Sequence, residues 1–432
     1  MQKMIVGERP SRARWLWIAP TLVLFELVGQ IDKVNIAVLL ADMRFLQDLE
    51  LIGQPARAGL LMTAFFAGYG IGQFLWGFIV DAIGPRRAAF VSLLLWSAIT
   101  GACGFVTRIG QLYVARWVLG LSEGGFWPIA NGYIARWFPM REHARMHSLW
   151  LSGFQLGQAV TPLLVTSLLT VTEWRGVFFA LSLLTLSPLI LVGFFASDDP
   201  YHSRRVNEAE RAFIAAGRAE EVLTVTQRSG LKAILRDVRF WFVTTIHTLG
   251  VIALYGLTTW IPTYVTQARG FSLSSMGKWL ALAYLLPIGT LLLFGHVADR
   301  TMRRALVGAM GSFLGAVFVI GAVAVPIRGL AILFLVLAAA PPAIMGAMNV
   351  SLIQVFIRRS YVGRATGMCV GIANILGSAG PWIVGHLLGL FGGNYWVAFG
   401  FIGFVYMLMS TLYLLLSRVM EEQNLAVAFQ RA

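Results

Sequence analysis

The sequence predicts an all-α polytopic membrane protein with twelve transmembrane helices in two pseudo-symmetric six-helix halves. The chain has 432 residues, of which 58% are hydrophobic and only 12% are charged. Apolar stretches of about 20 residues recur along its whole length, and each is long enough to cross a bilayer as a helix. One long polar stretch, residues 198–238, lies between the sixth and the seventh of them and divides the chain near its middle.

Each expected span is an apolar segment between polar loops. The twelve spans are residues 15–40, 57–81, 87–107, 110–136, 144–167, 176–197, 239–265, 275–298, 304–326, 329–356, 363–388 and 394–418. The chain therefore divides into an N-terminal half (1–197), a cytoplasmic linker (198–238), a C-terminal half (239–418) and a cytoplasmic tail (419–432). The linker is charged and contains two short helical patterns.

Basic residues predict the orientation in the membrane. With a cytoplasmic N-terminus, the cytoplasmic loops contain the linker arginines and Arg9, Arg12, Arg14, Arg86, Arg87, Arg136, Arg141, Arg145, Arg300, Arg303, Arg304, Arg358, Arg359 and Arg364. The opposite loops contain few, among them Arg44, Arg57, Arg108, Arg175, Arg269 and Arg328. Because cytoplasmic loops are enriched in Lys and Arg, we expect both termini and the linker on the cytoplasmic side of a bacterial inner membrane.

The sequence gives no sign of an enzyme. It lacks a phosphate-binding glycine loop, a nucleophile motif and any Cys/His spacing typical of a metal site. Cys103 and Cys369 lie in apolar segments, where they are interpreted as small core residues. The net charge of +14 is explained by the basic loops, so no nucleic-acid partner, metal or cofactor is expected.

A short motif occurs once in each half. The segment GFIVDAIGPRR (77–87) follows the second span, and GHVADRTMRR (295–304) follows the eighth. Each contains Gly, three residues, Asp and then a basic cluster. Two related six-helix halves joined by a linker are typical of a transporter built from repeats.

The first copy of this motif resembles the loop signature of the major facilitator superfamily, Gly-x-x-x-Asp-Arg-x-Gly-Arg-Arg. Ala82 stands where the signature has its first Arg. The resemblance implies a conformational latch between the halves, with a tight turn and a carboxylate near arginines. The expected latch residues are Asp81, Gly84, Arg86, Arg87, Asp299 and Arg300.

Four further stretches are similar to the anion:cation symporter branch of that superfamily. They are IDKVNIAV (31–38), GYGIGQFLWG (68–77), ARWVLGLSEGGFWPIANGYIARWFP (115–139) and LTTWIPTYV (257–265). In the first, Lys33 replaces the usual Arg. Members of the branch carry sugar acids such as galactonate, glucarate and hexuronates, other organic acids, and in animals phosphate and glutamate.

Five charged residues lie inside the expected spans, where a charge is costly and usually functional. They are Glu26, Asp32, Lys33, Arg116 and Glu123. Arg116 and Glu123 are seven residues apart and share one helix face, as do Asp32 and Asn35, which are three apart. The resemblance implies that the first and fourth spans line one central cavity, so that the charges meet there.

We expect Arg116 and Lys33 to bind the anionic group and Asp32 and Glu123 to take up protons. Arg suits a carboxylate because its guanidinium can bind it bidentately. A carboxylate in a dry cavity takes up a proton more readily than in water, and a nearby cation opposes this. An anion that engages the cation removes the opposition, which couples proton and anion binding reciprocally.

Other interpretations of the charges remain open. The four groups could form a structural ion pair that joins two helices, and Lys33 could be the partner of an acid rather than a ligand. Glu26 shares a face with Gln30 and Lys33 and could be a third protonatable group or a residue of the cytoplasmic vestibule.

The rest of a hydroxylated substrate needs hydrogen-bonding partners. The candidates are Asn35, Tyr69, Gln73, Gln155, Gln158 and Asn374. The leading expectation is a monomeric, proton-coupled importer of a small organic anion, such as a sugar acid, driven by the proton gradient. The alternatives are an exchanger or facilitator of aromatic or other organic acids, and a membrane sensor that does not transport.

Overall fold

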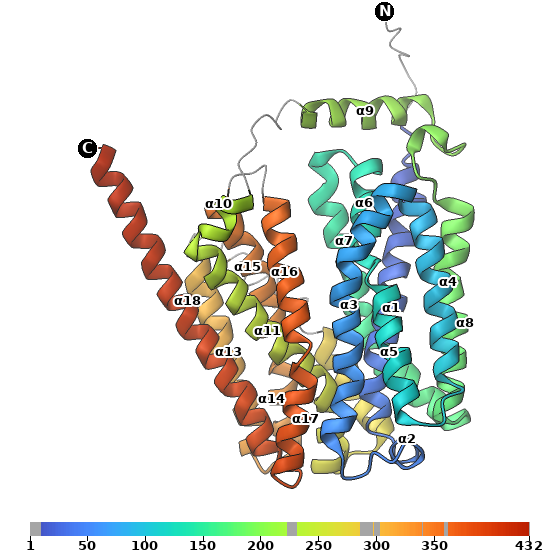
Figure 1. Cartoon of the computed structure of the whole chain (residues 1–432), viewed down its shortest axis with the longest axis vertical. Coiled ribbons are helices and arrows are strands. Elements are labelled where there is room, and N and C mark those ends of the chain that lie inside the picture. The colour runs from blue at the N-terminus through green and yellow to red at the C-terminus, as the bar shows by residue number, and fades with distance from the viewer. Residues whose placement is uncertain are drawn as a thin grey trace, which may run out of the picture.

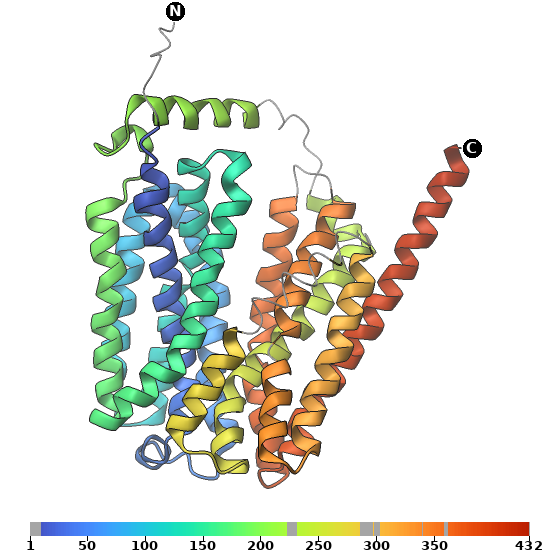
Figure 2. The same cartoon turned by 180° about the vertical axis from the view of Figure 1, so that it is seen from behind.

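The computed structural model describes residues 10–222, 231–285, 297, 303–338, 340–357 and 362–431. Regular structure in these ranges is helical throughout. Figures 1 and 2 show two helical bundles side by side, one from each half of the chain. The start of the first helix, the helix α9 (Glu208–Val222) and the end of the last helix lie on one side of the molecule, which we call the termini side. The opposite side is the far side.

The N-terminal bundle follows the first six predicted spans. Its helices are η1 (Arg14–Ile18), α1 (Ala19–Leu39), α2 (Met43–Asp48), α3 (Pro55–Ile83), α4 (Pro85–Cys103), α5 (Ile109–Glu123), α6 (Phe126–Trp137), α7 (Met140–Val171) and α8 (Trp174–Phe195). The segment after α8 contains η2 (Pro200–His202), α9 and α10 (Leu231–Arg236).

The C-terminal bundle follows the last six predicted spans. Its helices are α11 (Val238–Thr263), η3 (Tyr264–Ala268), a helix over residues 273–285, α13 (Arg304–Ala324), α14 (Arg328–Ala338), α15 (Pro341–Phe356), α16 (Val362–Gly377), α17 (Gly380–Leu390) and α18 (Tyr395–Arg431). The segment predicted as a tail, 419–432, continues α18 as helix through Arg431. Its Glu, Gln, Leu and Ala residues are good helix formers.

Seven of the described helices are long and apolar enough to cross a membrane. The helix α1 is not one of them, because Glu26, Asp32 and Lys33 interrupt its apolar sequence. In three of the predicted spans the structure describes two helices each, namely α5 and α6, α14 and α15, and α16 and α17. At the first break, Gly124 and Gly125 interrupt the fourth span directly after Glu123.

Small residues bring α5 into backbone contact with α3. A Cβ atom added at Gly120 would collide with the carbonyl oxygen of Phe65, and one added at Gly124 would lie 2.6 Å from the backbone nitrogen of Gln73. Gly72 of α3 faces the same helix. Small residues at membrane helix contacts permit this close approach. The packing fixes the position of Arg116 and Glu123, which α5 carries, relative to α3.

The two bundles touch through α3 and the C-terminal helices. Gly59 packs on the backbone of Pro381, and the Phe66 ring stacks on the Tyr255 ring with centroids 3.5 Å apart. Nearer the termini side, Phe78 is 72% exposed. The ribbons of the bundles diverge in that direction in both views (Figures 1 and 2). The halves are therefore joined on the far side and apart on the termini side.

The helix α9 is fixed to the N-terminal bundle by a buried carboxylate. Glu210 accepts hydrogen bonds from the Ser11 hydroxyl and the Ala13 backbone N–H, and it forms an ion pair of 2.6 Å with Arg14. Arg14 also pairs with Glu142 of α7 at 2.8 Å. Burial alone raises the pKa of Glu210, but these hydrogen bonds more than offset it and hold the pKa below its usual range.

The glycine packing predicts that Gly120→Ala destabilises the protein by about 1–3 kcal/mol, because the added methyl group overpacks the α3–α5 contact. The matched control is Gly110→Ala on the same helix, where a Cβ atom would meet nothing within 4 Å. The measurement is the melting temperature of each purified variant in detergent. Equal melting temperatures for the two variants would show that the α3–α5 contact is not close-packed.

Candidate functional site

The buried charges expected from the sequence lie inside the N-terminal bundle. Arg116 and Glu123 are fully buried, Asp32 is 1% exposed and Lys33 is 6% exposed. Asp32 and Lys33 are adjacent residues of α1, and Arg116 and Glu123 lie seven residues apart on α5. In the part of the chain that the structure describes, no Lys or Arg nitrogen lies within 4.0 Å of an Asp32 or Glu123 carboxylate oxygen.

The carboxylate of Asp32 is surrounded by hydrogen-bond donors. The Thr100 hydroxyl of α4 donates to Oδ2 at 2.6 Å, and the Trp96 indole N–H donates to the same oxygen. The amide of Asn35 donates to Oδ1 at 2.6 Å. Both carboxylate oxygens of Asp32 therefore have hydrogen-bond partners. Asn35 thus holds Asp32, and sequence analysis missed Trp96 and Thr100 because an apolar span gives no sign of which polar group it faces.

Arg116 keeps part of its hydrogen-bonding capacity unused. Its Nη1 donates to the backbone oxygen of Asp32 at 3.4 Å, and its guanidinium carbon lies 4.3 Å from the centroid of the Phe65 ring. The Nε and Nη2 nitrogens are buried and have no hydrogen-bond partner. A buried donor without a partner costs free energy. These two nitrogens are the pair that a carboxylate would bind bidentately.

Lys33 lies between two aromatic rings. Its Nζ is 4.4 Å from the centroid of the Tyr69 ring and 4.6 Å from that of Phe126, and it donates to the Tyr69 hydroxyl at 3.4 Å. Cation–π contacts stabilise a desolvated ammonium without neutralising its charge. The ammonium of Lys33 is therefore held by two aromatic rings and one hydroxyl, and it forms no ion pair with an acid in the described part of the chain.

Glu123 has the opposite environment to Asp32. Both of its carboxylate oxygens are buried, and neither has a hydrogen-bond partner. It is the last residue of α5, just before the two glycines that interrupt the fourth span. An ionised carboxylate without donors or a cation is costly to bury. The site thus contains one acid with a full set of donors and one with none.

Two of the expected substrate-binding residues bond to each other across the bundles. The amide nitrogen of Asn374 on α16 donates to Oε1 of Gln73 on α3 at 3.1 Å, and the Tyr255 hydroxyl donates to Asn374 Oδ1 at 3.0 Å. Gln155 on α7 is half-buried and makes no hydrogen bond to a described residue. The structure therefore brings Tyr69 to Lys33 and Gln73 to Asn374, and leaves Gln155 apart from both.

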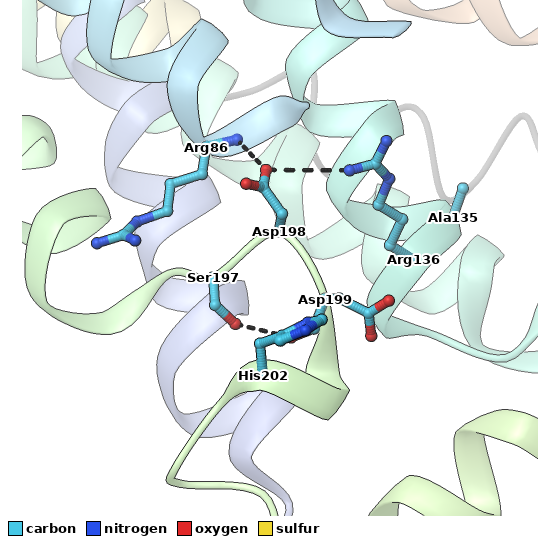
Figure 3. A pocket seen from close by; sticks show the side chains of 7 residues that line it. All are labelled: Arg86, Ala135, Arg136, Ser197, Asp198, Asp199 and His202. Atoms are coloured by element: carbon cyan, nitrogen blue, oxygen red, sulfur yellow. Dashed lines mark hydrogen bonds and ion pairs between the residues drawn. The ribbon is translucent and has the colours of Figure 1, made fainter. Parts of the chain in front are cut away.

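The expected latch has a partner that sequence analysis placed in the linker. Asp198 accepts a hydrogen bond of 2.8 Å from the backbone N–H of Arg86, and its Oδ1 lies 3.9 Å from Arg136 Nη1 (Figure 3). Gly84 has a φ of +83°, and a Cβ atom there would lie 2.7 Å from the same oxygen. Asp81 and Arg87 are exposed, while Asp299 and Arg300 lie outside the described residues.

These contacts border a cavity on the termini side with a volume of about 660 Å³. Its lining residues are Arg86, Ala135, Arg136, Ser197, Asp198, Asp199 and His202 (Figure 3). Charges of both signs alternate around it. The cavity therefore lies where the turn at Gly84 meets the start of the linker, and its lining includes none of the buried charges of α1 and α5.

Comparison with known proteins identifies the class to which this fold and site belong. The family model of the Major Facilitator Superfamily matches residues 31–367. The chain belongs to this superfamily of membrane transporters, and it is not an enzyme. A crystal structure of a bacterial homologue of the human lysosomal transporter Spinster has a TM-score of 0.75, covering 95% of this chain and 98% of that chain at 16% identity. The predicted two-half, twelve-helix fold is confirmed.

Relatives with known names are transporters of organic anions. The probable sulfoacetate transporter SauU of Cupriavidus necator is 29% identical over 70% of this chain and 69% of its own length. The hexuronate transporter of Bacillus subtilis is 25% identical over 88% and 91%. The probable L-galactonate transporter of Escherichia coli is 22% identical over 69% and 65%. The resemblance to an anion-transporting branch is therefore confirmed.

The geometry around Asp32 predicts that Thr100→Val destabilises the protein by about 1–3 kcal/mol, because it removes a donor from a buried carboxylate at nearly constant volume. The matched control is Thr185→Val, since the buried Thr185 hydroxyl donates only to its own helix, at the Leu181 oxygen. Melting temperatures in detergent measure the difference. A control that loses as much stability as Thr100→Val would contradict the assignment of Thr100 to Asp32.

Proposed function

We propose that the protein is a proton-coupled symporter that imports a small organic anion, a sugar acid such as galactonate, glucarate or a hexuronate, by alternating access. The observation that carries the proposal is the set of two buried cations, each with capacity to bind a further anion, beside two buried carboxylates in opposite environments. Named relatives that transport hexuronate and L-galactonate support the substrate class.

The substrate carboxylate would bind the free Nε and Nη2 groups of Arg116 and the ammonium of Lys33. Both cations are buried here, so the anion must displace the aromatic packing of Phe65 or Tyr69 to reach them. Binding would satisfy two donors that have no partner in this conformation. The free energy gained from these contacts offsets the cost of removing the anion from water.

Glu123 would carry the coupled proton, with Asp32 as the second acid of the site. Asp32 already accepts three hydrogen bonds in this conformation. Glu123 has none, so a proton on it removes an uncompensated buried charge. An anion on Arg116 and Lys33 withdraws their positive charge from both acids and favours protonation. By reciprocity, protonation then favours anion binding by the same factor.

The alternating-access step would break the contacts between the halves. We propose that the termini side is cytoplasmic, as the basic loops indicate, so that this conformation is closed to the outside. Opening outward requires loss of the Gln73–Asn374 hydrogen bond and of the Phe66–Tyr255 stack. The same polar groups, with Tyr69 and Gln155, would bind the substrate hydroxyls. The proton gradient of a bacterial inner membrane would drive the cycle of a monomer.

An exchanger or facilitator of aromatic acids is the second candidate. The observation in its favour is the run of aromatic rings beside the cations, where Phe65 lies under Arg116 and the stacked pair of Phe66 and Tyr255 lies between the halves. An aromatic acid could stack on such rings. Gradient dependence and a substrate panel distinguish the two candidates.

The test is uptake of labelled galactonate, glucarate, glucuronate and benzoate into proteoliposomes, with and without an inward proton gradient. Symport predicts gradient-driven accumulation of one sugar acid, and its loss in Asp32→Asn and Glu123→Gln. The control Glu173→Gln changes an exposed carboxylate and should behave as the unchanged protein. Uptake that only equilibrates, whatever the gradient, would refute proton coupling, and accumulation of benzoate alone would favour the second candidate.

A further inference from the structure

A third buried acid, Glu26, lies on α1 and takes no part in the site described above. It is 2% exposed. Its Oε1 accepts a hydrogen bond of 2.8 Å from the Gln30 amide, while its Oε2 is buried and has no partner. A purely structural carboxylate in a membrane bundle would be expected to have both oxygens satisfied. One free oxygen therefore needs an explanation.

The position of Glu26 is fixed by a close contact between α1 and α7. A Cβ atom added at Gly153 would lie 3.1 Å from the Glu26 Cβ and 2.6 Å from the backbone oxygen of Val23. A Cβ atom at Gly157 would meet the Gln30 Cβ at 2.6 Å in the same way. Because residues 153 and 157 are glycines, α7 has no side chain where it contacts Glu26 and Gln30. Glu26 is thus held in a dry contact, six residues along α1 from Asp32 toward the termini side.

The positive group that interacts with Glu26 is Lys33. Helical side chains lean toward the N-terminus of their helix, so Lys33, seven residues later, extends toward Glu26. Among the titratable groups of the described residues, Glu26 interacts electrostatically with Lys33 and with the Tyr69 hydroxyl of α3. Gly153 and Gly157 of α7, which face Glu26 and its partner Gln30, contribute no charge. Lys33 therefore links Glu26 to the proposed anion site.

The balance of buried charge then requires a second proton. Lys33 and Arg116 supply two positive charges, and Glu26, Asp32 and Glu123 supply three negative charges when ionised. With a monoanion bound the net charge is −2, so two protons are needed for neutrality, and Glu123 accounts for one of them. A net charge in a dry membrane bundle is costly.

We propose that Glu26 is a third proton-binding group of the transport cycle, with Lys33 as its counter-charge when no anion is bound. When the substrate carboxylate engages Lys33, Glu26 Oε2 accepts a proton from water on the side where substrate enters. It returns the proton to water on the other side after the anion leaves, and no bond of the substrate changes. This inference rests on the proposed function and deepens it, because it adds one proton to each cycle.

The test is the proton-to-anion stoichiometry, measured from the reversal of flux in proteoliposomes with the sugar acid that accumulates, beginning with galactonate and glucuronate. Each coupled proton multiplies the accumulation ratio by about tenfold per pH unit of gradient. The proposal predicts that the accumulation ratio of Glu26→Gln is lower by one factor of about ten per pH unit of gradient. This variant should still bind the anion and exchange it across the membrane. The control Glu208→Gln, an exposed acid of α9, should keep the full ratio.

A second variant keeps the test valid if Glu26→Gln does not fold. Glu26→Asp retains an ionisable group, so it should keep the full stoichiometry while the pH of half-maximal uptake shifts. A Glu26→Gln protein with unchanged stoichiometry, or one that no longer binds the anion, would overturn the inference, as would Glu26→Asp with an unshifted pH profile. If the unchanged protein ignores the gradient, the proposed function fails first, and the role of Glu26 fails with it.

Discussion

The cost of burying charge is the constraint on which this structure depends. The helices α1 and α5 of the N-terminal bundle bury two cations and three acids in a setting where each ion needs a compensating contact. The aromatic rings of Phe65, Tyr69 and Phe126 hold the cations. Trp96, Thr100 and Asn35 hold Asp32. Both carboxylate oxygens of Glu123, Oε2 of Glu26, and Nε and Nη2 of Arg116 are buried without a hydrogen-bond partner.

Those uncompensated groups are where chemistry can occur. A donor or acceptor that is already satisfied gains little from a ligand, whereas a buried group without a partner gains a full interaction. The two nitrogens of Arg116 favour an anion, and the oxygens of Glu123 and Glu26 favour a proton. The proposed coupling rests on this arrangement, because an anion bound at Arg116 would change the electrostatic cost of ionising the acids.

The close packing of small residues makes the arrangement possible. Gly120 and Gly124 bring α5 onto α3, and Gly153 and Gly157 bring α7 onto α1. Without them, side chains would separate α5 from α3 and α1 from α7. The contacts between the halves include the Gln73–Asn374 hydrogen bond, the Phe66–Tyr255 stack and, nearer the far side, the packing of Gly59 on Pro381. The bundles can therefore move as units while the charge cluster stays inside one of them.

The sequence predicted the helical spans and the charged positions because hydrophobicity and helical spacing are local properties. Arg116 and Glu123 were placed on one face by their spacing alone. The donors around Asp32 could not be found this way, because Trp96 and Thr100 belong to a distant apolar helix whose rotation is set by packing. The Gln73–Asn374 bond spans 301 residues and depends on the conformation of the whole molecule.

Local sequence also gave incomplete boundaries and incomplete partners. The break at Gly124 and Gly125 separates α5 from α6, although hydrophobicity continues across it. Asp198 contacts the Gly84 turn and Arg86 from a segment that composition marked only as a linker. The helix break and the position of Asp198 both depend on tertiary contacts, which override weak local preferences for secondary structure.

The most direct test of the account is the affinity of the purified protein for the proposed sugar-acid substrate as a function of pH, measured in detergent without a membrane gradient. Anion and proton binding that are coupled through the buried charges require affinity to weaken as pH rises through the range where the acids ionise. The slope of that decline gives the number of protons taken up with each anion. An affinity that does not change with pH would contradict the coupling, and with it the role assigned to the buried acids.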